Sequence, residues 1–505
     1  MSKTKPSSRA KRPSSEAKRS SPAASFLILA AGLGKRMKSP LPKVLHEICG
    51  EPMLVALLRS LAGARADAEI GVIVGHGREK VEAAVRAAVA ANPALGKLRI
   101  AFLVQSEQKG TGHAVREAMA TEWGRERVES GAPVVVLPGD TPLVPSALVE
   151  AVSAPLEKKA ALRLLTCTLA EPKGYGRIVR AGGKGTGAVL RIVEEKDASP
   201  KERAIREVGV SVYAFDSAFL AASLPKLTTK NAQGEYYLTD LVGMAAKAKK
   251  KIATLGWANA EDLRGVNDLW ELSQVERTLQ LRIVEAHARA GVRFLDPYSV
   301  AIEAGVAIGE GVKIHRGVVL RGSTAIGHGV DIGSNTVLRS VKVGDLVEFK
   351  AGCYAENSIV EDGAKVGPYA HLRPESHVGR QAKIGNFVEL KKATIGEQTS
   401  IAHLSYVGDA KIGARVNIGC GFITCNFDGR VKNGVRKHVT VIGDDCFIGS
   451  DVQMVAPVEI GKGAYVASGS TITKNVEADA LAIARARQEN KAGYASRLRQ
   501  MSEKE

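Results

Sequence analysis

The sequence predicts two folded domains of different classes, a Rossmann-like α/β domain followed by a parallel β-helix. Between Phe26 and about residue 267, short apolar runs alternate with stretches of helical periodicity, which is typical of a parallel sheet with helices on both faces. Residues 268–290 keep helical periodicity without a Gly or Pro, and this predicts a long connecting helix. From Ile302 an aliphatic residue, often followed by Gly, recurs every six residues, as in "IEAGVA IGEGVK". This hexapeptide period is the pattern of a parallel β-helix.

These changes of pattern predict five segments. They are a basic disordered tail over residues 1–25, the α/β domain over 26–267, the linker helix over 268–292, the β-helix over 293–487 and a polar C-terminal tail over 488–505. A chain of 505 residues exceeds one ordinary core, so more than one domain is expected. No apolar run approaches the ~20 residues of a membrane span, and we therefore expect no membrane partner.

Charge and cysteine content narrow the classes of partner. The formal net charge is +18, and the tail over residues 1–25 carries +6 of it. The surplus on the folded part favours anionic partners such as nucleotides, coenzymes, phosphorylated sugars or nucleic acid. The composition of the tail alone is that of a solvated, disordered segment. The six cysteines are scattered without a CxxC pair, which indicates neither a disulfide framework nor a zinc site and fits reduced thiols in the cytoplasm.

The stretch "FLILAAGLGKRMKSPLPKVLH", residues 26–46, allows two interpretations. As an export signal it should end in an uncharged cleavage site of small residues, but the apolar run meets Lys35 and Arg36 instead. As a buried strand it would lead into a loop whose glycines, Gly32 and Gly34, let backbone N–H groups approach phosphate oxygens. We favour the phosphate-binding loop, although two surface cations after a strand would look similar.

The longer string "LAAGLGKRMKSPLPKVL" resembles the signature of sugar-1-phosphate nucleotidylyltransferases. The resemblance implies a nucleoside triphosphate, UTP, as substrate on this loop. It implies catalytic roles for Arg36 and Lys43, which would bind the triphosphate and stabilise the leaving pyrophosphate. The residues that it places along the nucleotide are Leu29, Ala30, Ala31 and Gly32.

A candidate metal ligand follows the apolar run in "VVVLPGDTPLV". Asp140 lies just after a predicted strand, where an acidic residue near a polyphosphate commonly holds Mg2+. The residues Gly-Asp-Thr-Pro are also typical of a β-turn, so the alternative is that Asp140 only stabilises a turn. In the family a G-D-x-P-L motif places this aspartate on the metal, with Gly139 among the substrate contacts. By the same resemblance Asn267, in "RGVNDLWEL", joins Asp140 at Mg2+.

The segment "QSEQKGTGHA", residues 105–114, resembles the family's base-reading loop. The Gln105 amide can pair with a pyrimidine edge, and Gly110 and Thr111 would let the backbone approach uracil. The alternative is a helix N-terminus capped by Thr111, and both can hold together. His113 has no separate functional case in the sequence and is expected to be structural.

The sugar-binding half of the family resembles "GYGRIV" and "RIVEEKDAS". The resemblance implies that Gly176 contacts the sugar through its backbone, that Glu194 accepts hydrogen bonds from sugar hydroxyls and that Lys196 lies near phosphate. Gly209 stands where the family usually has a sugar-binding Asn, and Pro138 where it usually has Tyr. These two departures leave the sugar selectivity open.

Strings in the β-helix, among them "HLRPES" and "IAHLSYVGDAKIG", resemble a family of bifunctional bacterial enzymes that make UDP-N-acetylglucosamine. With the first domain, the resemblance covers residues 26–487. It implies a left-handed β-helix, a homotrimer and acetyl-CoA as co-substrate. His403 would be the general base, because a histidine titrates near neutrality. The other residues that it implies are Arg373 and Lys391 at phosphate, Tyr406 and Asn417 at the sugar, Asn426 and Phe427 near the acetyl group, and Ser450, Ser468 and Arg485 at coenzyme A.

Two details of this second site depart from the family. Cys420 stands where Ala is usual, beside the acetyl-CoA path, and we expect a small buried residue there rather than an acyl-carrying nucleophile. The loop "FDGRVKNGVRKHVTVIG" is longer than usual, and its Asn433-Gly434 pair predicts a hairpin turn. Its substrate-binding lysine could be Lys432 or Lys437. We prefer Lys437, because its spacing to the following Gly443 is retained.

The resemblance implies two consecutive reactions. Glucosamine-1-phosphate is N-acetylated by acetyl-CoA, and N-acetylglucosamine-1-phosphate then receives a uridylyl group from UTP with Mg2+, giving UDP-N-acetylglucosamine and pyrophosphate. One alternative keeps only uridylyl transfer, with the β-helix as a trimerising scaffold. Another makes the chain an anion- or nucleic-acid-binding protein through its basic tail, although we do not expect a nucleic-acid partner. The sequence leaves open what the tail binds and whether activity is regulated.

Overall fold

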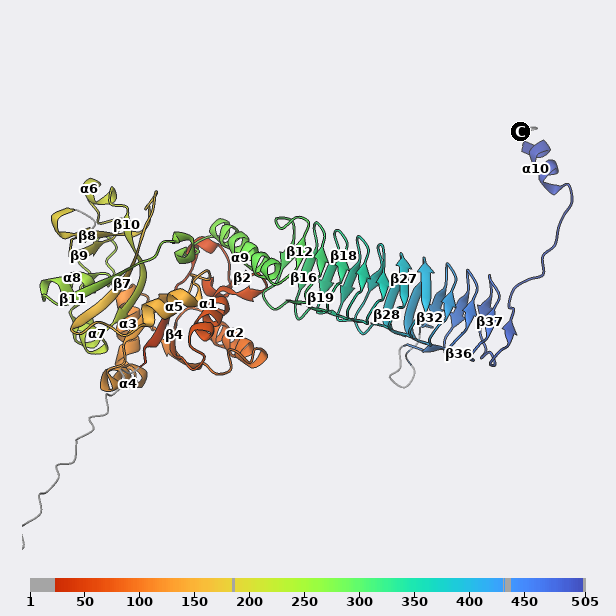
Figure 1. Cartoon of the computed structure of the whole chain (residues 1–505), viewed down its shortest axis with the longest axis horizontal. Helices are drawn as coiled ribbons and strands as arrows, with labels where there is room; N and C mark the ends of the chain where they lie inside the picture. The colour runs from red at the N-terminus through yellow and green to blue at the C-terminus, as the bar shows by residue number, and fades with distance from the viewer. Residues whose placement is uncertain (1–22, 184–186, 430, 432–436, 503–505) are drawn as a thin grey trace, which may run out of the picture. The chain divides into compact units, whose positions relative to one another are not determined.

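The computed structural model describes residues 23–183, 187–429, 431 and 437–502 (Figure 1). The chain forms two compact units, one up to Val275 and one from Glu276 onward. The division falls inside helix α9 (Leu269–Arg289), which is the long helix that the periodicity of residues 268–290 predicts. Within the described residues, no helix combines the length and the apolar character that crossing a bilayer requires.

The first unit is built on a nine-stranded sheet whose main path runs β11-β7-β10-β6-β1-β4-β5. The strands on this path are β1 (Ser25–Leu29), β4 (Glu69–Val74), β5 (Arg99–Val104), β6 (Val134–Pro138), β7 (Ala160–Thr168), β10 (Glu207–Phe215) and β11 (Lys251–Gly256). Strand β1 is central and pairs in parallel with β4 and β6. The apolar runs at β1, β4 and β6 are buried strands, as predicted, whereas β5 at the sheet edge is only partly buried.

Helices cover both faces of this sheet. Successive side chains of β1 point to opposite faces, so both faces are apolar and each packs against helices. Phe26 and Ile28 pack in one apolar cluster, and Leu27 packs in another. The longer helices are α1 (Met53–Ala64), α2 (Arg78–Ala91), α3 (Thr111–Ala120), α4 (Glu122–Ser130), α5 (Ser146–Ser153), α7 (Ser217–Ser223) and α8 (Asp240–Lys247). Helices α1, α2 and α5 contribute to the first cluster, and α3, α4, α7 and α8 to the second.

The expectation of a wholly parallel sheet is wrong in one part. Strand β10 runs antiparallel to both β6 and β7, and the pair β8 (Gly176–Arg180) and β9 (Val189–Val193) is antiparallel as well. A parallel connection needs a crossover of a dozen or more residues, usually a full helix. Strand β8 is antiparallel to both β9 and β10, so β9 and β10 run in the same direction, with the short helix α6 (Pro200–Arg203) between them in the sequence. The reversal is introduced between β8 and β9, where the eight residues 181–188 are too few for a crossover.

The second unit is a left-handed parallel β-helix, visible in Figure 1 as a stack of coils. One sheet of eleven strands holds β12 (Arg293–Phe294), β15 (Lys313–Ile314), β18 (Asp331–Ile332), β21 (Glu348–Phe349), β24 (Lys365–Val366), β27 (Lys383–Asn386), β29 (Ser400–His403), β31 (Asn417–Ile418), β34 (Phe447–Ile448), β37 (Tyr465–Val466) and β39 (Leu481–Ala482). Partner residues on neighbouring coils are mostly 17 or 18 apart, as Lys313 and Asp331 are, which corresponds to three hexapeptides per coil.

The remaining strands form a seventeen-stranded sheet that supplies the other sides of the coils. They are β13 (Ala301–Ile302), β14 (Ala307–Ile308), β16 (Val319–Arg321), β17 (Ala325–Ile326), β19 (Val337–Arg339), β20 (Lys342–Val343), β22 (Tyr354–Glu356), β23 (Ile359–Val360), β25 (His371–Leu372), β26 (His377–Val378), β28 (Glu389–Ile395), β30 (Tyr406–Ile412), β32 (Ile423–Cys425), β33 (Thr440–Ile442), β35 (Gln453–Val455), β36 (Val458–Ile460) and β38 (Thr471–Ile472). Helix α10 (Tyr494–Ser502) follows the last coil and is exposed throughout.

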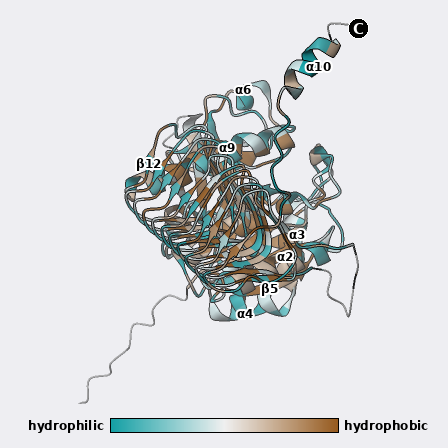
Figure 2. Ribbon diagram, turned by 90° about the vertical axis from the view of Figure 1, so that its right-hand side faces the viewer, coloured by the Kyte–Doolittle hydropathy of each residue, from teal (hydrophilic) through white to brown (hydrophobic). Residues whose placement is uncertain are grey.

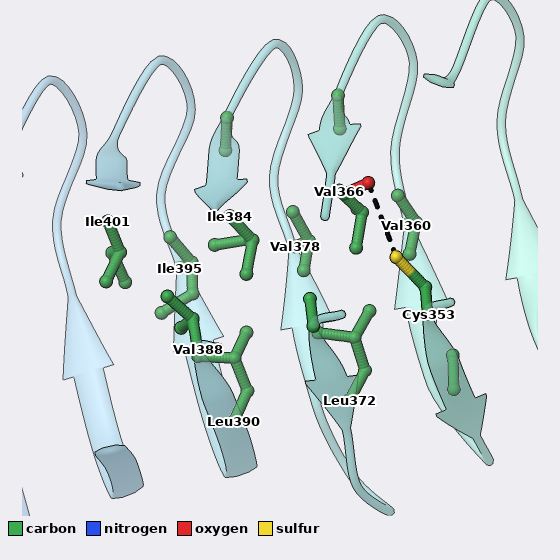
Figure 3. Packing of buried hydrophobic residues seen from close by; sticks show 14 of the residues in the cluster. Cys353, Val360, Val366, Leu372, Val378, Ile384, Val388, Leu390, Ile395 and Ile401 are labelled. Atoms are coloured by element: carbon green, nitrogen blue, oxygen red, sulfur yellow. Dashed lines mark hydrogen bonds between the residues drawn. The ribbon is translucent and has the colours of Figure 1, made fainter. Parts of the chain in front are cut away.

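The aliphatic position of each hexapeptide fills the interior of the coils (Figure 3). Leu372 pairs with Leu390 on the next coil, and Val366 pairs with Ile384, so like side chains stack along the axis. Figure 2 shows hydrophobic and hydrophilic segments alternating along the coils. Each coil buries its neighbour's apolar row, and stability therefore comes from stacking.

Candidate active sites

The loop after β1 turns back on itself and places two cations at the carboxyl end of the sheet. Arg36 lies in the short 3-10 helix Lys35–Met37, and Lys43 begins a second one, Lys43–Leu45. Gly34 has a left-handed φ of 58°, and a Cβ there would lie 2.8 Å from Lys43 Cβ. The motif's second glycine thus admits both the turn and the close approach of Lys43.

These cations meet two oxygen ligands that are distant in the sequence. Asp140 follows β6, and Asn267 comes just before α9. Arg36 donates to Asn267 Oδ1 at 2.8 Å, Lys43 Nζ donates to the same oxygen at 3.2 Å, and Lys43 also forms an ion pair with Asp140. The Asn267 backbone N–H donates to Glu271 Oε2 at 2.7 Å, which anchors the loop to the first turn of α9. The structure therefore brings together four residues that the motifs predicted.

The same geometry fits a magnesium ion. One positively charged atom, Lys43 Nζ, already contacts oxygens of both Asp140 and Asn267, so a single cation can reach both. Mg2+ prefers hard oxygen ligands and retains several waters, and two protein ligands plus phosphate oxygens suit it. Among the described residues, no cluster of three or more His, Cys, Asp or Glu side chains could hold a metal.

A cavity of about 900 Å3 opens beside this cluster. The predicted residues that line it are Leu29, Ala31, Gly32, Arg36, Gln105, Gly110, Thr111, Asp140 and Asn267. Lining residues that the motifs did not single out include Gln108, Tyr175, Val210, Ser211 and Glu271. Ala30 and Gly139 are buried behind the loop, and the Gly139 N–H donates to Leu29 O at 2.9 Å, which joins the ends of β1 and β6.

Gln105, which also lines this cavity, follows β5 and is 7% exposed. Its amide nitrogen lies 3.4 Å from Gly110 O and 3.3 Å from His113 Nδ1. The expectation that Thr111 caps helix α3 is wrong. Gly110 is the capping residue without a side-chain hydrogen bond, and the Thr111 hydroxyl accepts from Leu238 N at 3.3 Å. This hydrogen bond connects the first residue of α3 to a loop that is 127 residues away in the sequence.

The predicted sugar-binding residues come from the antiparallel part of the sheet. Glu194 follows β9 and accepts from Thr239 Oγ1 at 2.9 Å. A Cβ at Gly176 would lie 3.6 Å from both Glu194 carboxylate oxygens, so glycine leaves that face of the carboxylate uncovered. Burial raises the pKa of Glu194 above the ordinary carboxyl value, the carboxylates of Asp197 and Asp240 raise it further, and the Thr239 hydrogen bond opposes them. Lys196 is exposed.

Gly209 lies in β10, at the position where the family usually has a sugar-binding Asn. It is buried, and a Cβ there would lie 3.1 Å from Ile192 Cδ1. The pairing of β10 with β7 is interrupted between Gly209 and Tyr213, and Ser211 has a left-handed φ of 59° within this irregularity. Bulges of this kind re-aim side chains, and Ser211 lines the cavity. Sequence reasoning missed Ser211, because only the strand pairing reveals the bulge.

The second candidate site lies on the β-helix around His403, at the end of β29. His403 Nδ1 is 2.7 Å from Asn386 Oδ1, on the preceding coil. The amide oxygen can only accept, so Nδ1 carries the proton and Nε2 has the free lone pair. The sequence search missed Asn386, although it stands in the string "IGNFVE" one coil before His403.

The strand register places further predicted residues in one column with His403. Ile401 pairs with Ile418, Ile418 with Ile448, and Ile448 with Val466. The residues two positions after these are His403, Cys420, Ser450 and Ser468, and they therefore occupy equivalent positions on four successive coils. Neighbouring strands are about 4.8 Å apart. Ser450 N donates to Ser468 Oγ at 3.1 Å, and Arg485 lies beside Gly469 at the end of this column.

A polar cluster lies on the neighbouring sheet. Arg373 Nη1 donates to Glu389 at 2.8 Å, and Glu389 pairs in register with Tyr406. Asn426 is 5% exposed and donates through Nδ2 to Asp409 Oδ2 at 2.7 Å.

The described end of the long loop reaches this cluster. Lys437 Nζ lies 3.5 Å from Asn426 Oδ1 and 4.5 Å from the centre of the Phe427 ring. Lys432 and the predicted Asn433-Gly434 turn lie outside the described residues. Lys391 is half-buried on β28 opposite Gly408, and Asn417 is exposed on β31.

Comparison with known proteins agrees with both domains. A model of the MobA-like NTP transferase domain matches residues 26–198, and a model of the bacterial transferase hexapeptide (six repeats) matches residues 440–474. Proteins named "Bifunctional protein GlmU" are similar over nearly their whole length. Those of Alkaliphilus metalliredigens and Halalkalibacterium halodurans are 42% and 43% identical over 472 residues, 93% of this chain and 98% of each relative. That of Listeria monocytogenes is 41% identical over 473 residues, 94% of this chain and 98% of the relative. A solved structure of UDP-glucose pyrophosphorylase with UDP-glucose matches 51% of this chain and 98% of that one, at 16% identity and a TM-score of 0.40.

Proposed function

The chain belongs to the family of bifunctional GlmU proteins, and from this premise we propose how the residues of its two sites divide the work. The protein is a bifunctional enzyme of UDP-N-acetylglucosamine synthesis, with a nucleotidyltransferase domain and a hexapeptide acetyltransferase domain. We assign uridylyl transfer to the cavity of the first unit and acetyl transfer to the column around His403. The observation that carries the first assignment is the convergence of Arg36, Asp140 and Asn267 on the wall of the cavity, with Lys43 in contact with Asp140 and Asn267.

In the uridylyl transfer, a phosphate oxygen of N-acetylglucosamine-1-phosphate attacks the α-phosphorus of UTP, and pyrophosphate leaves. Arg36 and Lys43 neutralise the triphosphate and the departing charge, which is electrostatic catalysis by preplaced groups. Asp140 and Asn267 would hold Mg2+, which supplies further charge neutralisation when bound. Gln105 would read the base, and Glu194 would accept hydrogen bonds from sugar hydroxyls.

In the acetyl transfer, the amine of glucosamine-1-phosphate attacks the thioester carbon of acetyl-CoA. His403 Nε2 accepts the proton that the amine loses, and the thiolate of coenzyme A takes up a proton as it leaves. Asn386 orients the ring, because its amide oxygen accepts from Nδ1 at 2.7 Å. The column from His403 through Cys420 to Ser450 and Ser468 suits an extended thioester chain, with the small Cys420 beneath it.

The phosphate end of the amino sugar would meet Arg373 and Lys391, and its hydroxyls would meet Tyr406 and Asn417. Asn426 and Phe427 would border the acetyl group, and Lys437 would close this side of the site from the long loop. Arg485 would contact coenzyme A at the far end of the column. This arrangement argues against a non-catalytic β-helix, because a scaffold alone would not need the Asn386–His403 pair.

We propose that the chain forms a homotrimer through the corner of the β-helix beside His403. Tyr369, Phe387 and Leu404 stand on successive coils there, each more than half exposed, and the rings of Tyr369 and Phe387 stack with centroids 5.6 Å apart. An apolar row of this kind is typical of an interface. We also propose a cytoplasmic location, since all six cysteines are free thiols.

A coupled assay tests the proposed function as a whole. The protein is incubated with glucosamine-1-phosphate, acetyl-CoA, UTP and Mg2+, and UDP-N-acetylglucosamine is identified by mass spectrometry. We expect no product when any one of the four is left out. A second mixture, in which N-acetylglucosamine-1-phosphate replaces glucosamine-1-phosphate and acetyl-CoA, should also give product. Product formed directly from glucosamine-1-phosphate and UTP as fast as from the acetylated sugar would contradict the assigned order of steps.

The substitution Glu194→Gln tests the sugar-binding role through its pH dependence. Ionised Glu194 accepts strong hydrogen bonds, and a neutral amide loses roughly 1 kcal/mol of binding, so KM for the sugar phosphate should rise roughly five- to tenfold. Because the pKa of Glu194 is raised, the wild-type KM should increase on acidification at a higher pH than an ordinary carboxyl would cause. The KM of Glu194→Gln should not follow pH in this range.

The same substitution should weaken sugar binding but stabilise the folded protein. A raised pKa in the folded state means that ionisation of Glu194 opposes folding, so this cost is absent at low pH and grows as pH rises through the folded pKa. Glu194→Gln should therefore have the higher Tm at pH 8, and the difference should shrink toward pH 5. Glu157→Gln, at an exposed carboxylate paired with Lys251, is the control and should leave KM unchanged. A pH-independent KM in the wild type would refute the assignment.

A further inference from the structure

The amide of Gln105 is held from two sides. Its nitrogen lies 3.4 Å from Gly110 O and 3.3 Å from His113 Nδ1. Gln105 and His113 are both buried, with exposed fractions of 7% and 5%. A carbonyl oxygen only accepts hydrogen bonds, so the group of Gln105 that faces Gly110 has to be its NH2. The second N–H then meets Nδ1 of His113, which has to be the unprotonated ring nitrogen. The orientation of the amide follows from these partners.

The surroundings of His113 maintain that arrangement. Its Nε2 lies 3.7 Å from Glu117 Oε1, one helical turn further along α3, which favours the proton on Nε2. The ring also lies against Tyr236, with centroids 6.0 Å apart. The Tyr236 carbonyl accepts from Gly112 N at 2.8 Å, so the ring that flanks His113 is itself tied to the start of α3.

The opposite end of the amide is left for the ligand. In the described part of the chain, Gln105 Oε1 accepts no hydrogen bond, and Gln105 lines the cavity of the nucleotidyltransferase domain. We propose that His113 is the positioning residue that sets base specificity, by fixing Gln105 so that only a hydrogen-bond acceptor faces the base. Uracil presents the N3–H donor that this acceptor requires, whereas cytosine presents a lone pair at N3 and is repelled. This inference rests on the proposed role of Gln105 in the uridylyl transfer.

Three substitutions at His113 test the proposal in the full-length protein. Steady-state kcat and KM are measured for UTP and for CTP, with saturating N-acetylglucosamine-1-phosphate and Mg2+. His113→Leu removes the acceptor, so the amide can rotate, and the preference for UTP over CTP should fall roughly three- to tenfold, the worth of one neutral hydrogen bond. The loss should appear mainly in KM, because the reacting phosphates are not touched.

Two conservative variants separate positioning from packing. In His113→Asn the side-chain oxygen can take the place of Nδ1, and the UTP preference should return toward the wild-type value. In His113→Gln the polar atoms reach the place of Nε2 instead, and the preference should stay low. If His113→Leu does not fold in calorimetry, the contrast between the Asn and Gln variants carries the test.

The failures are distinguishable. A wild-type protein that transfers no nucleotidyl group from UTP would overturn the proposed function itself. An active protein that uses UTP and CTP equally well would overturn only the present inference. The same conclusion would follow if every His113 variant lowered the two activities by one common factor, as a loss of packing would do.

Discussion

Replacing His403 by alanine is expected to lower the release of free thiol from acetyl-CoA by at least about a hundredfold and to leave pyrophosphate release from UTP unchanged. General-base catalysis by a positioned side chain contributes roughly 10²–10⁴ in rate. Nε2 is the nitrogen with the free lone pair, since Nδ1 is bonded to Asn386. The two activities reside in separately folded units, so the loss should not spread to the first.

The measurement pairs a thiol-reactive dye with a pyrophosphate assay on the same preparation. His377→Ala is the matched control, because His377 also lies on the β-helix and is bonded to an acidic partner, Glu361, at 2.7 Å. It should retain thiol release. Asn386→Ala should fall between the two, since the base remains but its ring is no longer oriented. Full thiol release by His403→Ala would show that another group takes the proton.

Replacing Asp140 by asparagine is expected to lower uridylyl transfer by at least about a hundredfold, with acetyl transfer unchanged. A bound metal supplies several kcal/mol of transition-state stabilisation. The substitution removes the charged member of the two protein ligands that we propose for it, Asp140 and Asn267. It also removes the carboxylate that forms an ion pair with Lys43. The Mg2+ concentration that gives half the maximal rate should therefore rise together with the loss of rate.

Pyrophosphate release is measured across a Mg2+ titration at saturating UTP and sugar phosphate. Glu157→Gln is the charge-matched control in the same unit, because Glu157 is exposed and forms an ion pair with exposed Lys251. It should not change the Mg2+ dependence. An Asp140→Asn enzyme with the wild-type Mg2+ dependence would exclude Asp140 as a metal ligand.

Much of the architecture follows from periodicity that is local in the chain. The strand at β1, the helix α9 and the six-residue repeat of the β-helix all depend on neighbouring residues, and each was predicted close to its observed position. The antiparallel direction of β10 was not predicted. The reversal is introduced at the short connection between β8 and β9, and apolar patterning does not indicate strand direction.

In the candidate sites, too, motifs predict single residues, and the tertiary structure shows which of them interact. Motifs pointed to Arg36 and Asn267 separately, but they are 231 residues apart, and only folding shows that one donates a hydrogen bond to the other. Asn386 was not predicted for a related reason. Nothing in its own segment marks it as functional until the register of β27 and β29 sets it beside His403.

The sequence by itself determined the two domain classes, the order of their elements and the loops that carry the chemistry, because strands, helices and hexapeptide coils are encoded by short-range patterns. Only the tertiary structure decided how individual polar groups are oriented, such as the amide of Gln105 and the ring of His403. The physical reason is that hydrogen-bond direction depends on the partner, and these partners come from other turns and coils.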